Sequence, residues 1–130
     1  MSVEENKALV RRFFAAFNAQ DAAALTDVLA TPELAESFVS AARWTVETYG
    51  AEHHIEPVEL VGEGDTVMAR VASRGGHTGT WQGIPPTGKQ WTNKRYGRFR
   101  IADGKIAEAE FLMDRLGHLK QLGATVAPPT

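Results

Sequence analysis

The chain has 130 residues, with 14 basic and 16 acidic side chains and a formal net charge of −2. This balance argues against a nucleic-acid or anionic-membrane partner, because both require a concentrated positive field. The absence of cysteine excludes disulfides, thiolate nucleophiles and zinc–thiolate sites. The length suits one domain over residues 1–130, and the charged N-terminus has no apolar signal segment, so we expect a cytoplasmic protein.

Three helices are predicted in the first fifty residues. Apolar residues recur at helical spacing within 2–21, which predicts an amphipathic first helix. Asp21 is a suitable N-cap for a short second helix over 22–30. Thr31, which is followed by a proline, predicts the start of a third helix that ends at Gly50.

After Gly50 the hydrophobic pattern alternates, which predicts strands. The glycine pair 75–76 suggests a bulge, after which 77–83 would continue the same bent strand, and 84–89 reads as a loop. A short helix over 116–123 and a loose tail over 124–130 are expected at the end. The strands are expected at 53–61, 66–74, 90–101 and 105–114.

Helices followed by a run of antiparallel strands are typical of an α+β protein rather than a doubly wound sheet. We expect the helices to cover the concave side of a curved sheet. A pocket for a small molecule would then lie between the sheet and the helices.

Two stretches of the C-terminal half resemble a known family. They are "VMARVASRGGHTGTWQGIPPTGKQW" and "RFRIADGKIAEAEFLMDRLGHLKQLG". With their Gly-x-His-x-Gly, Pro-Thr-Gly-Lys and Asp-Gly-Lys-Ile elements and their terminal Gln-Leu-Gly, they resemble the SnoaL-like polyketide cyclases, also called ester cyclases. That family belongs to the cone-shaped cystatin-like, or nuclear transport factor two-like, α+β superfamily.

The resemblance implies an activity. Members with a known reaction close the last ring of aromatic polyketides by an intramolecular aldol condensation, with an Asp as acid and base and no metal or cofactor. It therefore implies a small hydrophobic or aromatic carbonyl ligand, no cofactor, and a homodimer, as is common in the superfamily.

The sequence departs from the family pattern at two places. Glu110 stands four residues before Asp114, where the family tends to have Trp, so a more polar cavity is expected. The connection over 30–36 lacks the strand and His-bearing turn that the family usually has there. One wall of the pocket is therefore expected to be altered.

Asp114 has two interpretations. It follows a largely apolar segment, and a buried carboxyl among apolar side chains acquires a raised pKa suited to acid–base catalysis near neutral pH. The resemblance assigns the acid/base role to it. Alternatively, Asp114 caps the last helix by accepting from the amides of Leu116 or Gly117.

His77 is the second catalytic candidate. In a strand it would share a face with Gly79 and Trp81, leaving room for a ligand whose developing oxyanion the imidazole could bind. The alternative is a core histidine bonded to a backbone carbonyl.

Other side chains are candidates for substrate binding. Arg95 shares a predicted strand face with Trp91 and Phe99 and could anchor a carboxylate, phenolate or enolate, or simply lie on apolar surface with its head in water. His53 and His54 point to opposite faces of a strand, and no metal-site spacing is recognisable. The substrate-binding candidates are Arg95, Trp91, Trp81, Glu110, Arg70, Phe14 and Phe17, of which the two Phe could equally be core.

The leading hypothesis is therefore a cofactor-independent cyclase in which Asp114 moves the proton and His77 binds the oxyanion. One alternative is a non-catalytic ligand-binding module on the same fold. Another is an isomerase or epoxide hydrolase that acts on a small hydrophobic ketone or epoxide.

Overall fold

The computed structural model describes residues 2–129 and contains the four predicted helices and four of the predicted strand segments. Ser2 and Glu5 form a reciprocal capping box at the start of the first helix, and Asp21 and Thr31 cap the next two. Within the described range no helix is both long and apolar enough to cross a membrane. The elements are α1 Val3–Asn18, α2 Ala22–Val28, α3 Pro32–Tyr49, β1 His54–Glu63, β2 Thr66–Gly76, β3 Gln90–Ala102, β4 Lys105–Met113 and α4 Arg115–Gln121.

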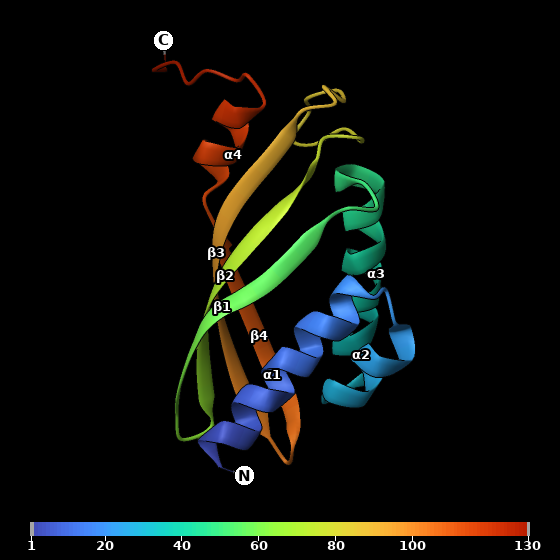
Figure 1. Cartoon of the computed structure of the whole chain (residues 1–130), viewed down its shortest axis with the longest axis vertical. Helices are drawn as coiled ribbons and strands as arrows, with labels where there is room; N and C mark the ends of the chain where they lie inside the picture. The colour runs from blue at the N-terminus through green and yellow to red at the C-terminus, as the bar shows by residue number, and fades with distance from the viewer. Residues whose placement is uncertain (1, 130) are drawn as a thin grey trace.

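The four strands form one antiparallel sheet in chain order, β1-β2-β3-β4 (Figure 1). β4 pairs with β3 only between Arg95 and Ala102, so the first residues of β3 lack a strand partner on that side. There α4 takes over, because the Gln121 side chain accepts from the Thr92 N–H at 2.9 Å and donates to the Thr92 carbonyl at 2.6 Å. The terminal helix thereby completes the edge of the sheet.

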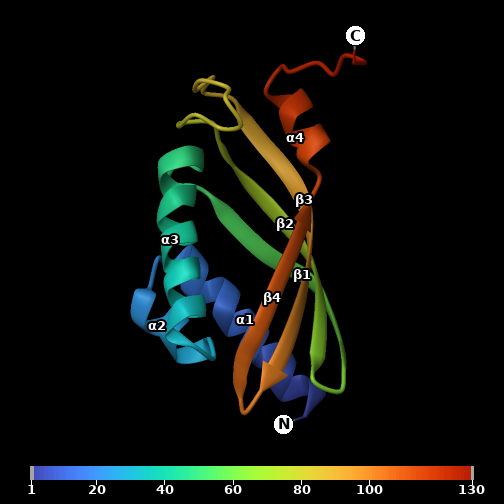
Figure 2. The ribbon, with the colours of Figure 1, turned by 180° about the vertical axis from the view of Figure 1, so that it is seen from behind.

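Helices α1–α3 lie on one face of the curved sheet, and α4 stands apart from them beside the upper part of β3 (Figures 1 and 2). This confirms the predicted α+β class, with helices on the concave side. The core beneath α1 is aromatic: Phe13 contacts Phe38 and Phe99 edge to face, with ring centroids 4.9 and 5.6 Å apart. Phe14 and Phe17 are buried in the same core, so the structure assigns both to packing.

The segment after the glycine pair differs from the prediction. Gly75 and Gly76 continue β2 in regular register opposite Trp91 and Gln90, and no bulge lies there. The expected strand over 77–83 is a loop instead, with a single isolated bridge between Trp81 and Ile84. The reason is that β1 begins at His54, opposite Arg74, so the chain beyond the glycines has no neighbouring strand to pair with.

The short connection between α2 and α3 lies against the start of β4. Leu29 forms an isolated parallel bridge with Ile106, and the Ala30 N–H donates to the Ile106 carbonyl at 2.8 Å. The segment that the sequence marks as unusual therefore packs directly on the sheet edge.

Candidate functional site

A cluster of aromatic and imidazole rings fills the upper end of the molecule, and we call it the upper cluster: Tyr49, His53, Trp81, Trp91 and His118. His118 stacks on Trp81 and tilts against Trp91, with ring centroids 4.2 and 4.3 Å away. Tyr49 lies edge-on to Trp91 at 4.7 Å, and the His53 ring lies 5.2 Å from that of Tyr49. The end of α3, the loops around 53 and 81, β3 and α4 thus meet at one place.

Glycines make this arrangement possible. A Cβ on Gly75 would lie 2.8 Å from the Trp91 ring, so only glycine leaves space for the indole, whose Nε1 donates to the Gly76 carbonyl at 2.7 Å. A Cβ on Gly79 would lie 2.7 Å from the carbonyl oxygen of Glu47, so this glycine allows the loop to approach α3. Gly79, which the sequence suggested would leave room for a ligand, instead allows close packing of the loop on α3.

Four buried polar atoms around the upper cluster have no hydrogen-bond partner among the described residues. They are His53 Nε2, Asn93 Oδ1, Arg95 Nε and His118 Nε2. Buried polar groups are normally paired, so several unpaired groups in one region mark a place where water or a ligand completes them. No comparable concentration occurs elsewhere in residues 2–129, where the one other such atom is Asn6 Oδ1.

Burial and the charge of Arg95 control ionisation in this region. The pKa values of His53 and His118 are both lowered to about 4. Desolvation is the larger cause, and repulsion by the nearby Arg95 cation is the next. Burial also raises the pKa of Tyr49, and the attraction of Arg95 opposes that change. Desolvation lowers the pKa of Arg95 itself. At neutral pH the upper cluster therefore contains neutral imidazoles and a neutral phenol, and the Arg95 guanidinium cation lies beside it.

A groove of about 330 Å³ reaches Arg95 from solvent beside the end of β4. Its walls include Phe111, Met113 and Arg115. Phe111 and Met113 share the inner face with Arg95, because they lie opposite Gly97 and Arg95 in the β3–β4 register. A planar apolar molecule with an anionic substituent matches this lining of rings, thioether and cations.

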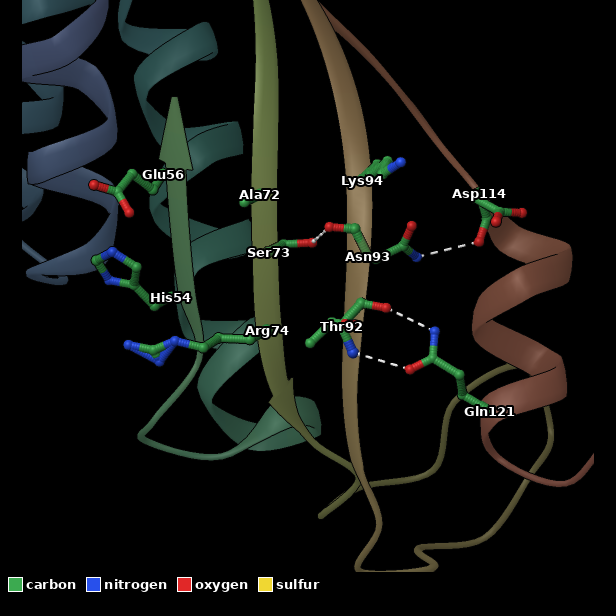
Figure 3. Close-up of a pocket in the computed structure, with 10 residues that line it drawn as sticks. All are labelled: His54, Glu56, Ala72, Ser73, Arg74, Thr92, Asn93, Lys94, Asp114 and Gln121. Atoms are coloured by element: carbon green, nitrogen blue, oxygen red, sulfur yellow. Dashed lines mark hydrogen bonds between the residues drawn. The ribbon is translucent and has the colours of Figure 1, made fainter. Parts of the chain in front are cut away.

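Asp114 is exposed and caps α4. Its Oδ1 accepts from the Gly117 N–H at 2.8 Å, and a Cβ on residue 117 would overlap the carboxyl. Figure 3 shows the Asp114 main chain held to Asn93, whose side-chain amide donates to the Asp114 carbonyl at 3.1 Å. The carboxyl also borders a cavity of about 500 Å³ that lies between α4 and the convex face of the sheet. Arg74 and Lys94 are among the residues that line this cavity. The capping interpretation is therefore what this structure displays.

His77 is buried, and both ring nitrogens are occupied by its own loop. The Thr87 N–H donates to Nδ1 at 3.2 Å, which leaves the proton on Nε2, and Nε2 donates to the Ile84 carbonyl at 3.2 Å. The Gly88 N–H donates to the His77 carbonyl at 3.0 Å. His77 thus pins the loop over 77–88 and matches the core alternative considered from the sequence.

Two substrate-binding candidates lie on the wrong face. Glu110 is opposite Arg98 on the convex side and is exposed, so the expectation that it lines the pocket is wrong. Arg70 is also exposed on that side and pairs with Glu59 at 3.6 Å. Both follow the alternation of their strands, and helices α1–α3 cover the opposite face.

Of the substrate-binding candidates, Trp81 and Trp91 pack in the same cluster, and Arg95 lies close enough to lower the pKa of His53 and His118 there. Their ring partners Tyr49, His53 and His118 were not among the candidates from the sequence. For His118 a signal existed: Leu119 and Leu122 follow it at one and four residues, so the imidazole lies on the apolar side of a short helix. Tyr49 and His53 flank the glycine that ends α3, and nothing local distinguishes them from core residues.

The chain is similar to known proteins in both sequence and structure. The family profile of SnoaL-like polyketide cyclases matches residues 7–122. Aklanonic acid methyl ester cyclase DnrD of Streptomyces peucetius is 36% identical over 94 residues, which is 71% of this chain and 65% of that protein. Nogalonic acid methyl ester cyclase of Streptomyces nogalater is 32% identical over 88 residues, or 68% of this chain and 66% of that one.

The matches thus span just under two thirds of the length of these curated relatives. Among solved structures, TsrD from Streptomyces laurentii superimposes with a TM-score of 0.84 at 29% identity, covering 96% of this chain and 99% of that one. The fold is therefore the expected α+β cone of the nuclear transport factor two-like superfamily. With the family profile matched over most of its length, the chain belongs to the SnoaL-like polyketide cyclase family.

Proposed function

We propose that this chain catalyses ring closure of a polyketide-like carbonyl compound, with the substrate bound between the upper cluster and the groove beside Arg95. The observation that carries the proposal is the group of four unpartnered buried polar atoms among aromatic rings. An aromatic or polyketide substrate offers flat apolar surface for the rings and oxygens that can accept from the unpaired N–H donors, such as Arg95 Nε. The similarity of this chain to the two ester cyclases supports the choice of substrate class.

The proposed reaction is an intramolecular aldol addition. A base removes a proton from carbon next to a carbonyl, the resulting enolate carbon bonds to a second carbonyl carbon, and that carbonyl oxygen takes up the proton as a hydroxyl. Product and substrate have equal mass, and only protons move, so no redox cofactor or metal is needed. Arg95 would stabilise the negative oxygen through its charge and its unpaired Nε–H.

Asp114 is the proposed base. It lies between Met113 and Arg115, which both line the groove. To act there, its carboxyl would have to leave the Gly117 amide and turn from the convex-face cavity toward the groove. The Asn93 contact holds the main chain of Asp114 while the side chain exchanges partners. Proton transfer by a positioned carboxylate contributes roughly a hundredfold to ten-thousandfold in rate.

The test is turnover of the two esters named for the relatives, aklanonic acid methyl ester and nogalonic acid methyl ester, followed by chromatography with mass detection. We expect a product of unchanged mass and altered absorption. Arg95→Gln should raise KM about tenfold or more, because a hydrogen bond to a charged group is lost. The matched control is Arg98→Gln on the convex face, whose exposed pair with Glu108 contributes little. Equal effects of the two variants would contradict the proposed site.

A second candidate function is supported by one observation, the exposed capping state of Asp114. In that case the chain binds its ligand at the upper cluster without transforming it. Binding of the same esters by calorimetry, without a new product and with equal affinity in Asp114→Asn, would favour the binding module. Turnover of unsaturated ketones or epoxides instead would identify an isomerase or hydrolase.

We further propose that the convex face of the sheet pairs with a second copy of the chain. Its exposed apolar side chains alternate with the arginines and glutamates of that face. Such a surface is self-complementary in both apolar and charged groups. The apolar members are Val61, Met68, Tyr96 and Leu112.

A further inference from the structure

His118 belongs to a hydrogen-bond chain that defines where its proton lies. The Asp114 carbonyl can only accept, and the Asn93 side chain lies 3.1 Å from it, so the group facing this carbonyl is the Nδ2 amide. The same Nδ2 lies 3.3 Å from His118 Nδ1. A second hydrogen of that amide therefore points at Nδ1, which must accept.

An accepting Nδ1 places the proton of a neutral imidazole on Nε2. The ring is neutral at pH 7, because desolvation and the charge of Arg95 lower the pKa of His118 to about 4. Nε2 is fully buried and has no acceptor among the described residues. His118 thus keeps an unused N–H donor inside the upper cluster, and its ring is clamped between Trp81 and Trp91.

We propose that the Nε2–H group of His118 binds the anionic oxygen of a ligand, an enolate or a phenolate, which the Arg95 cation attracts into the same cluster. A neutral donor suits this task because an imidazolium beside Arg95 would be repelled. Asn93 is the positioning residue, since it holds the tautomer without touching the ligand. Oxyanion binding by His118 during cyclisation rests on the proposed function. The tautomer of His118 and its preference for an oxyanion are independent of that function.

The first test is long-range proton–nitrogen NMR of the uniformly ¹⁵N-labelled full chain at neutral pH. The His118 signals are identified by their loss in His118→Phe and in His118→Gln. We expect a neutral ring with its proton on Nε2 and an unprotonated Nδ1. A ring protonated on Nδ1, or a charged ring, would overturn the proposal even if neither variant binds ligand.

The second test compares two small probes by calorimetric titration: 4-nitrophenolate, which carries an oxyanion, and nitrobenzene, which lacks it. His118→Phe keeps a flat ring between the tryptophans but removes the donor, so it should weaken 4-nitrophenolate about tenfold to a hundredfold and leave nitrobenzene nearly unchanged. His118→Gln can place an amide N–H near the former Nε2 and should restore much of the loss. A matched control is His54→Phe, because His54 lies on the convex face of the sheet, away from the upper cluster. This variant should bind both probes with the wild-type affinity.

Equal weakening of both probes in His118→Phe would show a packing role only and overturn the proposal. Equal affinity of wild type and His118→Phe for 4-nitrophenolate would do the same, since a buried water would then be the partner of Nε2. If the chain does not cyclise the esters but still loses affinity for 4-nitrophenolate alone in His118→Phe, the proposed function is wrong and the oxyanion site remains supported. If His118→Phe cyclises the esters at the wild-type rate and binds both probes as the wild type does, the oxyanion site is wrong and the proposed function remains supported.

Discussion

Asp114 has an observed structural role, as the cap of α4, and a proposed chemical role, as the base. Its Oδ1 satisfies the Gly117 amide at the start of α4, and its main-chain carbonyl holds Asn93. Asn is as good a helix cap as Asp but cannot move a proton, whereas Ala can do neither. Substitutions at this residue therefore separate the two roles.

We predict that Asp114→Asn folds with a free energy of unfolding close to wild type but loses at least about a hundredfold in turnover. Asp114→Ala should lose turnover equally and also about 0.5–2 kcal/mol of stability, because the cap is gone. Urea unfolding and the ester assay measure the two effects. An Asn variant that turns over the substrate at the wild-type rate would rule out Asp114 as the base.

The buried imidazoles predict a pH dependence of stability. His53 and His118 have pKa values of about 4 in the folded chain, below the ordinary 6.5, so the unfolded chain binds more protons between these limits. Stability should therefore rise from pH 4 to 6.5 and be fully present above that range, with a slope of at most about 1.4 kcal/mol per pH unit for each imidazole. Urea unfolding across this range should show a smaller slope in His118→Phe. An unchanged slope would mean that His118 titrates normally.

The His77 side chain ties together the two ends of the loop over 77–88. His77 accepts from the Thr87 N–H and donates to the Ile84 carbonyl, and its own carbonyl accepts from Gly88. The loop contains two consecutive prolines, which cannot donate hydrogen bonds themselves. The loop also carries Trp81 into the upper cluster, so its order determines one wall of the site.

We predict that His77→Ala destabilises the chain by roughly 1–3 kcal/mol, since buried groups of the loop lose their partners. Hydrogen exchange at Thr87 should accelerate, and ligand affinity at the upper cluster should fall as Trp81 loses its support. The control is Thr80→Ala, an exposed position in the same loop that should leave all three measurements unchanged. Unchanged exchange at Thr87 in His77→Ala would contradict the pinning role.

Helices α1–α3 cover one face of the sheet and leave most of the other face to solvent (Figures 1 and 2). Leu112 is 73% exposed and lies opposite Tyr96 across the β3–β4 register. Nearby, Arg98 and Arg100 both pair with Glu108. An apolar patch of this kind on a sheet is typical of an interface.

We predict that the chain is a dimer in analytical ultracentrifugation and that Leu112→Glu shifts it toward the monomer at the same concentration, because a charge would be buried without a partner. Ser40→Glu, on the exposed surface of α3, is the matched control and should leave the mass unchanged. A wild-type chain that sediments as a monomer at high micromolar concentration would contradict the proposed pairing.

Local physical chemistry in the sequence determined most of the elements. Capping at Asp21 and Thr31, the phenylalanine spacing of α1 and the alternation through Trp91 and Arg95 each act between near neighbours, and all are present in the structure. The family motifs, which occur at several positions in the C-terminal half, predicted the fold through the resemblance to the SnoaL-like cyclases.

Other features depend on contacts between residues that are distant in the sequence. Residues 77–83 have an alternating pattern but no strand to pair with, and a strand is stable only when its backbone groups find partners. Glu110 faces solvent because the helices cover the other side of β4. His118 acquires its neutral state and free donor from Asn93, Arg95 and two tryptophans that are distant in sequence. Burial and hydrogen-bond partners depend on the whole packed chain, so no local pattern could specify them.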